Sequence, residues 1–252
     1  MRDTEGNAGK LGKRIALALG GGSARGLAHV LMLEVFDELG VKPTVIAGTS
    51  MGAICGAAYA AGLSGAELRA RCMALFANRA YFLKLLAGKM RALKIPFLAI
   101  AADFDAIEQV VLDKGPLIPA LAASSALPSL TRPVILGGRT LIDGGFVNPL
   151  PYDVVLDRAD VTVAVDVTGL PRRRPGAKLP RTLDAVTGST QILFHSITRE
   201  KLKLAAPHIL IRPGVGAFGA MDYFKIEAIL AAAKPAKEDL KHKLSQVLAE
   251  VG

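Results

Sequence analysis

The sequence has 252 residues, 51% of them hydrophobic, and this is long enough for one large α/β domain with a full core. Its longest nearly uninterrupted apolar stretch, residues 53–63, falls short of the ~18 residues that a membrane span needs, so no spanning helix is expected. The formal net charge of +9 permits attraction to nucleic acid, anionic lipid or acidic partners, and selects none of them.

Residues 1–12 are polar and lack the apolar core of a secretory signal, which predicts a flexible N-terminal tail. Cys55 and Cys72 are the only cysteines, and there is neither a CxxC motif nor a histidine close to them in sequence. This pattern predicts neither a metal site nor a disulfide framework. We therefore expect a cytoplasmic protein that uses no metal and no cofactor.

The first predicted unit is a strand, a glycine-rich turn, a helix and a second strand. Residues 15–19 form a short apolar run, residues 24–39 carry apolar side chains at helical spacing, and residues 44–47 form the second strand. Because the helix connects the two strands, a parallel pair is expected.

The rest of the chain continues the alternation of helices and strands. A helix is predicted over 51–61, and the capping-box spacing of Ser64 and Glu67 predicts the start of another. Strands are predicted at 97–102, 110–112, 134–136, 139–142, 161–165 and 209–211. The order predicts an α/β fold, a three-layer α/β/α sandwich with a mostly parallel central sheet.

No boundary divides the chain strongly into domains. We expect one domain over residues 13–212 and a C-terminal helical segment, 213–252, packed on it. Residues 171–181 contain three prolines and five basic residues, and this composition predicts an exposed loop.

Ser50 lies between Gly48 and Gly52 in a GxSxG motif that joins a predicted strand to a predicted helix. Small neighbours allow a tight, strained turn that projects the hydroxyl, and the positive N-terminal end of the helix points at the same place. Both features suit a nucleophile. The motif by itself is equally compatible with a serine that caps the helix.

Residues 20–26, GGGSARG, form the preceding strand-to-helix turn. Consecutive glycines let backbone N–H groups converge on an anion or a developing oxyanion, and this turn is expected beside that of Ser50. A dinucleotide site is disfavoured, because a GxGxxG motif ending at Gly26 requires glycine where the chain has Ser23. A Walker A loop would need a GK[ST] sequence, which the turn lacks.

Asp143 ends a predicted strand and is followed by Gly144 and Gly145. A carboxylate there can act as a base if it meets Ser50, although Asp-Gly alone is typical of a plain turn. His195 and His208 follow Asp143 in the order Ser, Asp, His, so an α/β-hydrolase triad is an alternative. That fold usually places several strands before its nucleophile, and here two are predicted.

These three motifs stand in the order found in the patatin-like phospholipase family, which the sequence resembles. The motifs are GGGSARG at 20–26, GTSMG at 48–52 and DGG at 143–145, and RGLAHV, ASSALPSLTRPV and DGGFVNPLPYDVV are similar to the bacterial branch. The resemblance covers most of the chain from about residue 13 to residue 211.

The resemblance implies a serine acyl hydrolase that cleaves lipid acyl esters, of phospholipids or lysophospholipids, through an acyl-enzyme. Ser50 would be the nucleophile and Asp143 its only side-chain partner, with burial of that carboxyl expected to raise its pKa. Ser23 departs from the plant members, which carry a third glycine there. The oxyanion hole would be formed by N–H groups around Gly21 and Gly22 in the loop opened by Gly20, with Arg25 helping to hold that loop.

The sequence also suggests roles for two serines, one cysteine and one histidine outside the three motifs. Ser124 and Ser125 could line the site near DGG, or simply start a turn. Cys55 is expected to be a small buried residue, and His29 a structural residue of the first helix.

Residues 69–94 contain seven basic residues and no acidic one, interleaved with apolar side chains. One hypothesis is that this segment, with the 171–181 loop, docks on anionic membrane at its inner surface and acts as a lid. The alternative is a helix packed on the core that displays solvated charge. Nucleic-acid binding is not expected, since no aromatic stacking platform accompanies the charge. A non-enzymatic regulator that binds an anion or nucleotide in the glycine loop is the other functional alternative.

Overall fold

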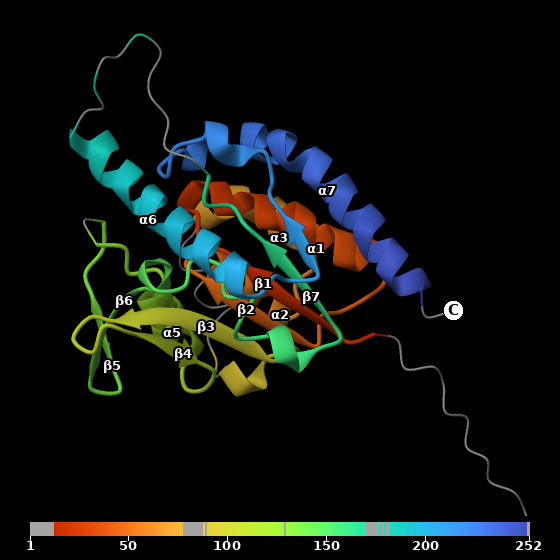
Figure 1. Ribbon diagram of the computed structural model, residues 1–252, viewed down its shortest axis with the longest axis horizontal. Helices are drawn as coiled ribbons and strands as arrows, with labels where there is room; N and C mark the ends of the chain where they lie inside the picture. Colours follow the sequence, from red (N-terminus) through yellow and green to blue (C-terminus); the bar gives the residue numbers. More distant parts are fainter. Residues whose placement is uncertain are drawn as a thin grey trace, which may run out of the picture.

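The computed structural model describes residues 13–77, 88, 90–128, 130–169, 176, 179 and 182–250. Its centre is one sheet in the order β5-β6-β3-β2-β1-β7-β8, with β4 also paired to β3 (Figure 1). Five neighbouring strands are parallel: β3 (Phe97–Asp103), β2 (Val45–Thr49), β1 (Ile15–Leu19), β7 (Val161–Val165) and β8 (Ile209–Ile211). The antiparallel strands are β4 (Glu108–Leu112), β5 (Val134–Leu136) and β6 (Arg139–Asp143).

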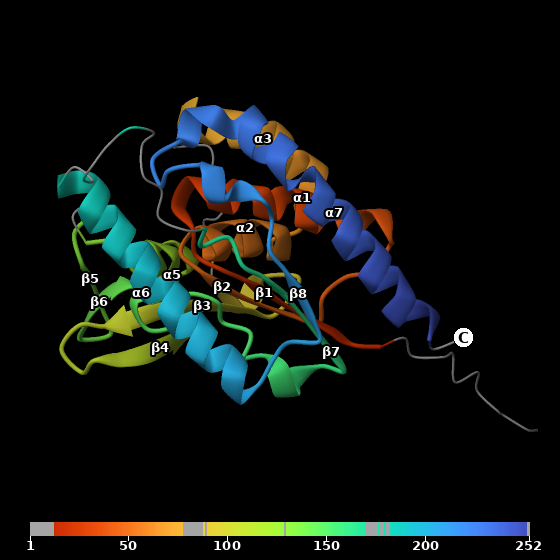
Figure 2. The ribbon, with the colours of Figure 1, turned by 45° about the horizontal axis from the view of Figure 1, so that its top comes forward.

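Helices lie on both faces of this sheet, which confirms the three-layer α/β prediction (Figure 2). On one face, α1 (His29–Glu38) and α2 (Met51–Ala60) contribute to the large core, and both α3 (Gly65–Ala77) and α7 (Ile226–Ala249) pack against α1. On the other face, residues 150–156 and the end of α6 (Thr182–Leu204) cover a smaller apolar cluster. A further helix, α5 (Leu117–Ser124), packs against β3.

The central strand β1 shows why its sequence is apolar throughout. Leu17 and Leu19 belong to the core beneath α1 and α2, whereas Ala16 and Ala18 face the smaller cluster on the opposite side. A parallel strand buried on both faces cannot alternate apolar and polar residues. The small alanines let the segment that contains Tyr152 approach the sheet closely.

The first helix differs from the expectation over residues 24–39. A short 3-10 helix, η1 (Ser23–Ala28), precedes α1, which begins only at His29. The tight winding accommodates a close contact, because a Cβ added to Gly26 would lie 2.4 Å from Met51 Cγ. This crowding brings the glycine loop against the start of α2.

Two sequence expectations lie partly outside the described residues. Residues 78–87 and 89 of the basic stretch 69–94, and all of 171–181 except residues 176 and 179, are among those that the structure does not describe, whereas Arg69 and Arg71 lie on α3. Among the residues that the structure describes, no helix is long and apolar enough to cross a membrane.

Candidate active site

The three sequence motifs come together because two strands meet end to end along β3. Residues 99 and 100 of β3 pair with both β2 and β4, and residues 101–103 pair with both β4 and β6, so β2 and β6 share one edge. Thr49, the last residue of β2, pairs with Ile100, and Asp143, the last residue of β6, pairs with Ala101. The residue after β2 and the carboxyl at the end of β6 therefore meet.

Ser50 occupies the sharp turn between β2 and α2. Its backbone has φ 55° and ψ −121°, a strained conformation that a non-glycine residue rarely adopts. The flanking glycines make the turn possible: a Cβ on Gly52 would lie 2.1 Å from the Leu19 carbonyl oxygen, and one on Gly48 would lie 2.5 Å from Ala53 Cα. The glycines of GxSxG are thus required by close backbone contacts.

Asp143 is almost fully buried, with a relative exposure of 1%. Burial raises the pKa of Asp143 to about 6, although hydrogen bonds from the Ser50 side chain and from the Gly145 N–H favour the ionised form. The Gly145 N–H donates to Asp143 Oδ1 at 2.8 Å. A carboxylate that is hydrogen-bonded to a serine hydroxyl and has a pKa near neutrality has the properties of a general base.

The glycines after Asp143 are also set by close approach. A Cβ on Gly144 would lie 2.2 Å from the Ile100 carbonyl oxygen, and one on Gly145 would lie 2.3 Å from the ring of Phe194 on α6. The DGG motif therefore fits the carboxylate between β3 and α6.

The glycine loop lies directly beside Ser50, since a Cβ on Gly21 would be 3.5 Å from Ser50 Cβ. Two of its amides are already engaged: Gly20 N–H donates to Val165 O at 3.0 Å and Gly21 N–H to Pro149 O at 2.8 Å. Gly21 thus differs from the sequence interpretation, because its N–H holds the loop instead of facing the site. In the part of the chain that the structure describes, the N–H groups of Gly22 and Ser23 have no acceptor. They are the available donors.

Arg25 anchors the glycine loop from behind. Its side chain is 3% exposed, and Nε donates to Val167 O at 3.2 Å while a terminal nitrogen donates to Phe218 O at 3.1 Å. With its amide oxygen toward the guanidinium, Gln191 of α6 accepts from both terminal nitrogens at 2.8 and 3.1 Å. Burial lowers the pKa of Arg25 to about 10, so the side chain stays charged at neutral pH.

Residues 148–150 connect all three motifs, a role that the sequence analysis did not assign. The Asn148 carbonyl accepts a hydrogen bond from the Thr49 hydroxyl at 2.8 Å, and the Asn148 N–H donates to Gly144 O at the same distance. The next carbonyl, that of Pro149, accepts the Gly21 N–H. The only sequence signal for this segment was its position after DGG in the family-like stretch.

A half-buried lysine joins this connecting segment to α6. Lys201 Nζ donates to the Asn148 side chain, to the Leu150 carbonyl and to Asp153. Burial lowers the pKa of Lys201, and its ion pair with Asp153 opposes that change. No motif points to Lys201, because its partners are about fifty residues away in sequence.

The two serines near DGG take different positions. The Ser50 N–H donates to Ser124 Oγ at 3.0 Å, so Ser124 supports the turn that carries Ser50. Among the described residues, the buried Ser125 hydroxyl has no hydrogen-bond partner.

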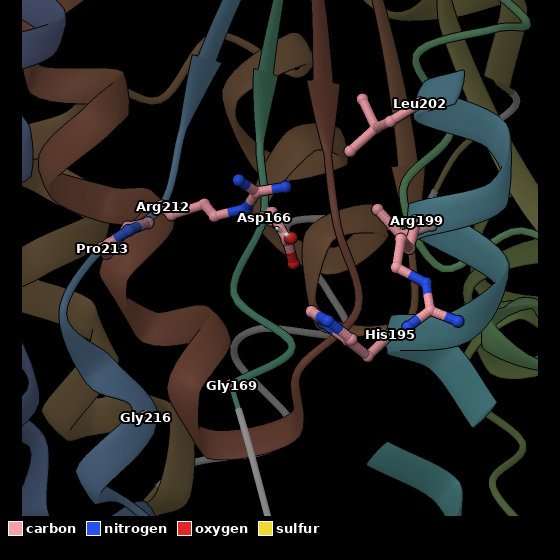
Figure 3. A pocket seen from close by; sticks show the side chains of 9 residues that line it. Asp166, Gly169, His195, Arg199, Leu202, Arg212, Pro213 and Gly216 are labelled. Atoms are coloured by element: carbon pink, nitrogen blue, oxygen red, sulfur yellow. Dashed lines mark hydrogen bonds and ion pairs between the residues drawn. The ribbon is translucent and has the colours of Figure 1, made fainter. Parts of the chain in front are cut away.

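All four histidines of the sequence are described, and none lines the cavity that contains Ser50 and Asp143. His195 lines a separate cavity (Figure 3). His208 Nδ1 accepts the Thr162 N–H at 3.1 Å, near the start of β7 and therefore at the opposite end of the strand from the glycine loop. The geometry does not support a triad through His195 or His208.

His29 instead supports the glycine loop. Its ring is fully buried, which lowers the pKa of His29 to about 4 and keeps the ring neutral. Nε2 lies 2.8 Å from the Gly20 carbonyl oxygen, and since a carbonyl only accepts, Nε2 carries the proton.

The cavity beside Ser50 is small, about 80 Å³, and mostly apolar away from Ser50 and Asp143. Leu127, Pro128 and Leu130 line one side, and Val186 and Phe194 of α6 line another. Such a lining suits an acyl chain better than a charged ligand. Among the described residues, no group of three or more His, Cys, Asp or Glu side chains is placed to hold a metal ion.

Comparison with known proteins finds one family. A family model described as "Patatin-like phospholipase" matches residues 17–100 and 102–156. An uncharacterized NTE family protein of Mycobacterium tuberculosis is 36% identical over 186 residues, which cover 64% of this chain and 51% of that protein. Patatin-like phospholipase domain-containing protein 7 of Rattus norvegicus is 31% identical over 184 residues, which cover 62% of this chain and 14% of that protein. This chain spans about half the length of its mycobacterial relatives.

The fold is also similar to that of a solved structure. The crystal structure of VipD from Legionella pneumophila aligns with a TM-score of 0.55 at 12% identity, covering 92% of this chain and 67% of that one. At this identity, the likeness concerns the fold alone.

Proposed function

We propose, since this chain belongs to the patatin-like phospholipase family, that it is a serine hydrolase of lipid acyl esters that acts through Ser50 and Asp143. The observation that carries the proposal is the hydrogen bond between the strained Ser50 and the buried carboxyl of Asp143, at the point where β2 and β6 meet. Phospholipids or lysophospholipids are the proposed substrates.

In the first half of the proposed reaction, Ser50 Oγ attacks the ester carbonyl carbon while its proton passes to Asp143. The tetrahedral oxyanion accepts hydrogen bonds from the Gly22 and Ser23 N–H groups, and the positive N-terminal end of α2 favours its charge. Collapse breaks the ester C–O bond, and the leaving alcohol takes the proton from Asp143. The product is an acyl-enzyme on Ser50.

In the second half, Asp143 removes a proton from water, which attacks the acyl-enzyme carbonyl at the same site. The second oxyanion uses the same two N–H donors. Collapse returns the proton to Ser50 and releases the fatty acid. Asp143 passes on each proton that it accepts and ends each half-reaction ionised, so the carboxylate alone completes the cycle without a histidine.

A fluorophosphonate probe tests the nucleophile and its base. We expect the probe to label Ser50, mapped by mass spectrometry, and we expect Ser50→Ala and Asp143→Asn to abolish labelling while His195→Ala and His208→Ala keep it. Loss of labelling in either histidine variant would support the triad instead. Nucleotide binding by folded protein that resists the probe would favour the regulator alternative.

We also propose that residues 69–94 and 171–181 contact an anionic membrane surface, and the support for this comes from the sequence. On α3, Arg69 lies 3.8 Å from Glu34 and Arg71 lies 3.9 Å from Glu67, so the free charge has to come from the other basic residues. Co-sedimentation with anionic and neutral liposomes at low and high salt tests this. Equal, salt-independent binding to both would contradict it.

A further inference from the structure

A second cavity, of about 560 Å³, lies farther along α6. Residues 186–194 of this helix line the Ser50 cavity, and residues 195–202 line the second one. Figure 3 shows His195 and Arg199 extending from α6, Arg212 from the segment after β8, and Asp166 between them. The carboxyl ends of parallel strands are the usual place for a ligand in an open α/β sheet, and the volume fits a small organic molecule.

Arg212 is held in place by a buried carboxylate. Its Nε lies 3.3 Å from Asp166 Oδ2, and the other oxygen, Oδ1, accepts the Thr168 N–H at 3.1 Å. Asp166 is 8% exposed, and each of its two carboxylate oxygens has one of these partners. The terminal nitrogens of Arg212 have no acceptor in the described part of the chain, which leaves their four N–H donors for a ligand.

Arg199 lies on the opposite wall of the cavity, on α6, and it also has unused hydrogen-bond donors. Its Nε lies 3.2 Å from Glu200 Oε1, and within the described ranges its terminal nitrogens have no acceptor. Glu200 is also paired with Lys203 at 2.7 Å. Two guanidinium groups with unused donors match the oxygens of a phosphate better than a single cation would.

The local charge balance is positive. Arg199, Lys203 and Arg212 oppose the carboxylates of Asp166 and Glu200, so these five side chains leave one net positive charge. A cavity with this charge balance attracts an anion, because both carboxylates are already paired with cations.

Thr198 supplies an independent indication of a ligand. It lines the cavity and is 3% exposed, yet among the described residues its hydroxyl has no hydrogen-bond partner. Burying a hydroxyl without a partner is unfavourable, and an acceptor on a ligand would remove that cost. Leu202 and Pro213 add an apolar wall to the same cavity.

We propose that this second cavity binds the phosphate group of a small phosphate ester. The terminal nitrogens of Arg199 and Arg212 donate to the phosphate oxygens, Thr198 donates its hydroxyl, and Leu202 and Pro213 contact the carbon part of the ester. The site also adjoins the hydrolytic machinery, because a Cβ on Gly169, which lines it, would lie 3.1 Å from Arg25 Cδ.

Calorimetric titration of the protein with glycerol 3-phosphate tests the site. We expect saturable binding of one ligand, weakened about tenfold or more by Arg212→Gln and by Arg199→Gln, since each removes charge-assisted hydrogen bonds. Arg158→Gln is the matched control, because Arg158 is exposed and lies outside the cavity. No binding, or equal affinity in all four proteins, would overturn the proposal.

Thr198→Val keeps the test valid if the arginine variants fail to fold. This substitution preserves the shape of the side chain and removes a hydroxyl that has no described partner, so the protein should fold normally. Weaker binding of glycerol 3-phosphate by folded Thr198→Val supports the proposal, and unchanged binding contradicts it.

Two further measurements identify the source of the phosphate. If it is a phospholipid headgroup, which rests on the proposed function, Arg212→Gln lowers kcat/KM for a phospholipid and leaves that for a monoacylglycerol unchanged. If it is a soluble ester, glycerol 3-phosphate alters the rate on both substrates in the wild type and on neither in Arg212→Gln. Ser50→Ala abolishes hydrolysis and keeps glycerol 3-phosphate binding, so failure of either proposal can be told from failure of the other.

Discussion

At the scale of single residues, the proposed chemistry depends on a carboxyl that is buried and must still ionise. Asp143 has little contact with water, and its hydrogen bonds from Ser50 and Gly145 only partly offset the cost of burying a charge. The same burial that makes Asp143 a better base for a hydroxyl therefore lowers the stability of the folded state at neutral pH. Burial of Asp143 should therefore favour the proposed activity and reduce the free energy of unfolding at neutral pH.

The pH dependence of the proposed reaction follows from the raised pKa of Asp143, about 6. Below that pH the carboxyl is protonated and cannot accept the Ser50 proton, so the labelling rate with fluorophosphonate should fall about tenfold between pH 7 and pH 5. The rate measured from pH 4.5 to pH 8 should have its midpoint near 6. His195→Ala should keep that midpoint, and a profile without a midpoint between pH 5 and pH 7 contradicts the assignment of the base.

The stability of Asp143→Asn should reveal the cost of burying the ionised carboxylate. The folded-state pKa of about 6 exceeds the ordinary value of 3.8, so the stabilising effect of the protonated carboxyl is present below pH 4 and is lost as pH rises through 6. The difference corresponds to about 3 kcal/mol. Asparagine keeps the acceptor for Gly145 N–H without the charge.

Urea unfolding at several pH values measures this prediction. Asp143→Asn should be more stable than the wild type at pH 8 by up to about 3 kcal/mol, with the advantage shrinking toward pH 4. An Asp143→Asn protein that is less stable than the wild type at every pH would show that the ionised carboxylate is well stabilised.

At the scale of elements, the site exists because short turns join strands and helices at very small distances. The carbonyls of residues 148–150 hold the turn before Ser50 and the glycine loop together, and Lys201 ties them to α6. The capping box predicted at Ser64 and Glu67 is confirmed: the Ser64 N–H donates to the glutamate at 2.8 Å, and the Glu67 N–H donates to the serine hydroxyl at 3.2 Å. Local signals of this kind can be recognised from sequence because both partners lie within one turn.

Gly52→Ala should be far more harmful than its small size suggests. A Cβ there would lie 2.1 Å from the Leu19 carbonyl oxygen, and neither backbone segment can move without displacing β1 or α2. We expect a loss of more than about 3 kcal/mol in unfolding free energy, or no folded protein.

The matched control is Gly88→Ala, because a Cβ at Gly88 would meet no described residue within 4 Å. Its unfolding free energy, measured in urea, should stay within about 0.5 kcal/mol of the wild type. Equal stability of the two alanine variants would mean that the close contact between α2 and β1 is not present in solution.

At the scale of the whole molecule, α7 joins the C-terminal end of the chain to the first helix. It buries Ile229, Leu240 and Leu244 in the large core, and its Lys237 lies 2.6 Å from both Glu34 and Glu38 of α1. The Lys237 pKa is raised, chiefly by its hydrogen bonds to these two glutamates, against the effect of burial. The ion pairs thus fix the direction of α7 across α1, while the apolar residues supply most of the packing.

Lys237→Met should loosen this contact. The variant leaves Glu34, whose side chain is 10% exposed, without its nearest cation, so we expect the unfolding free energy to fall by about 2 kcal/mol. Lys234→Met is the control, because Lys234 lies on the same helix but is exposed. Thermal unfolding of both variants measures the effect, and equal melting temperatures would show that the ion pairs contribute nothing.

The sequence by itself determined the elements whose signals are local: the glycine turns, the apolar strands, the capping box and the order of the three motifs. Tertiary structure decided what these signals leave open. Whether Asp143 reaches Ser50 depends on β2 and β6 sharing one edge of β3, a pairing between segments almost a hundred residues apart. Whether Gly21 or its neighbours offer a free N–H depends on where the Pro149 carbonyl comes to lie. The roles of Lys201, His29 and the Arg199 and Arg212 cavity likewise depend on long-range packing, because no local pattern specifies which distant group a buried side chain will meet.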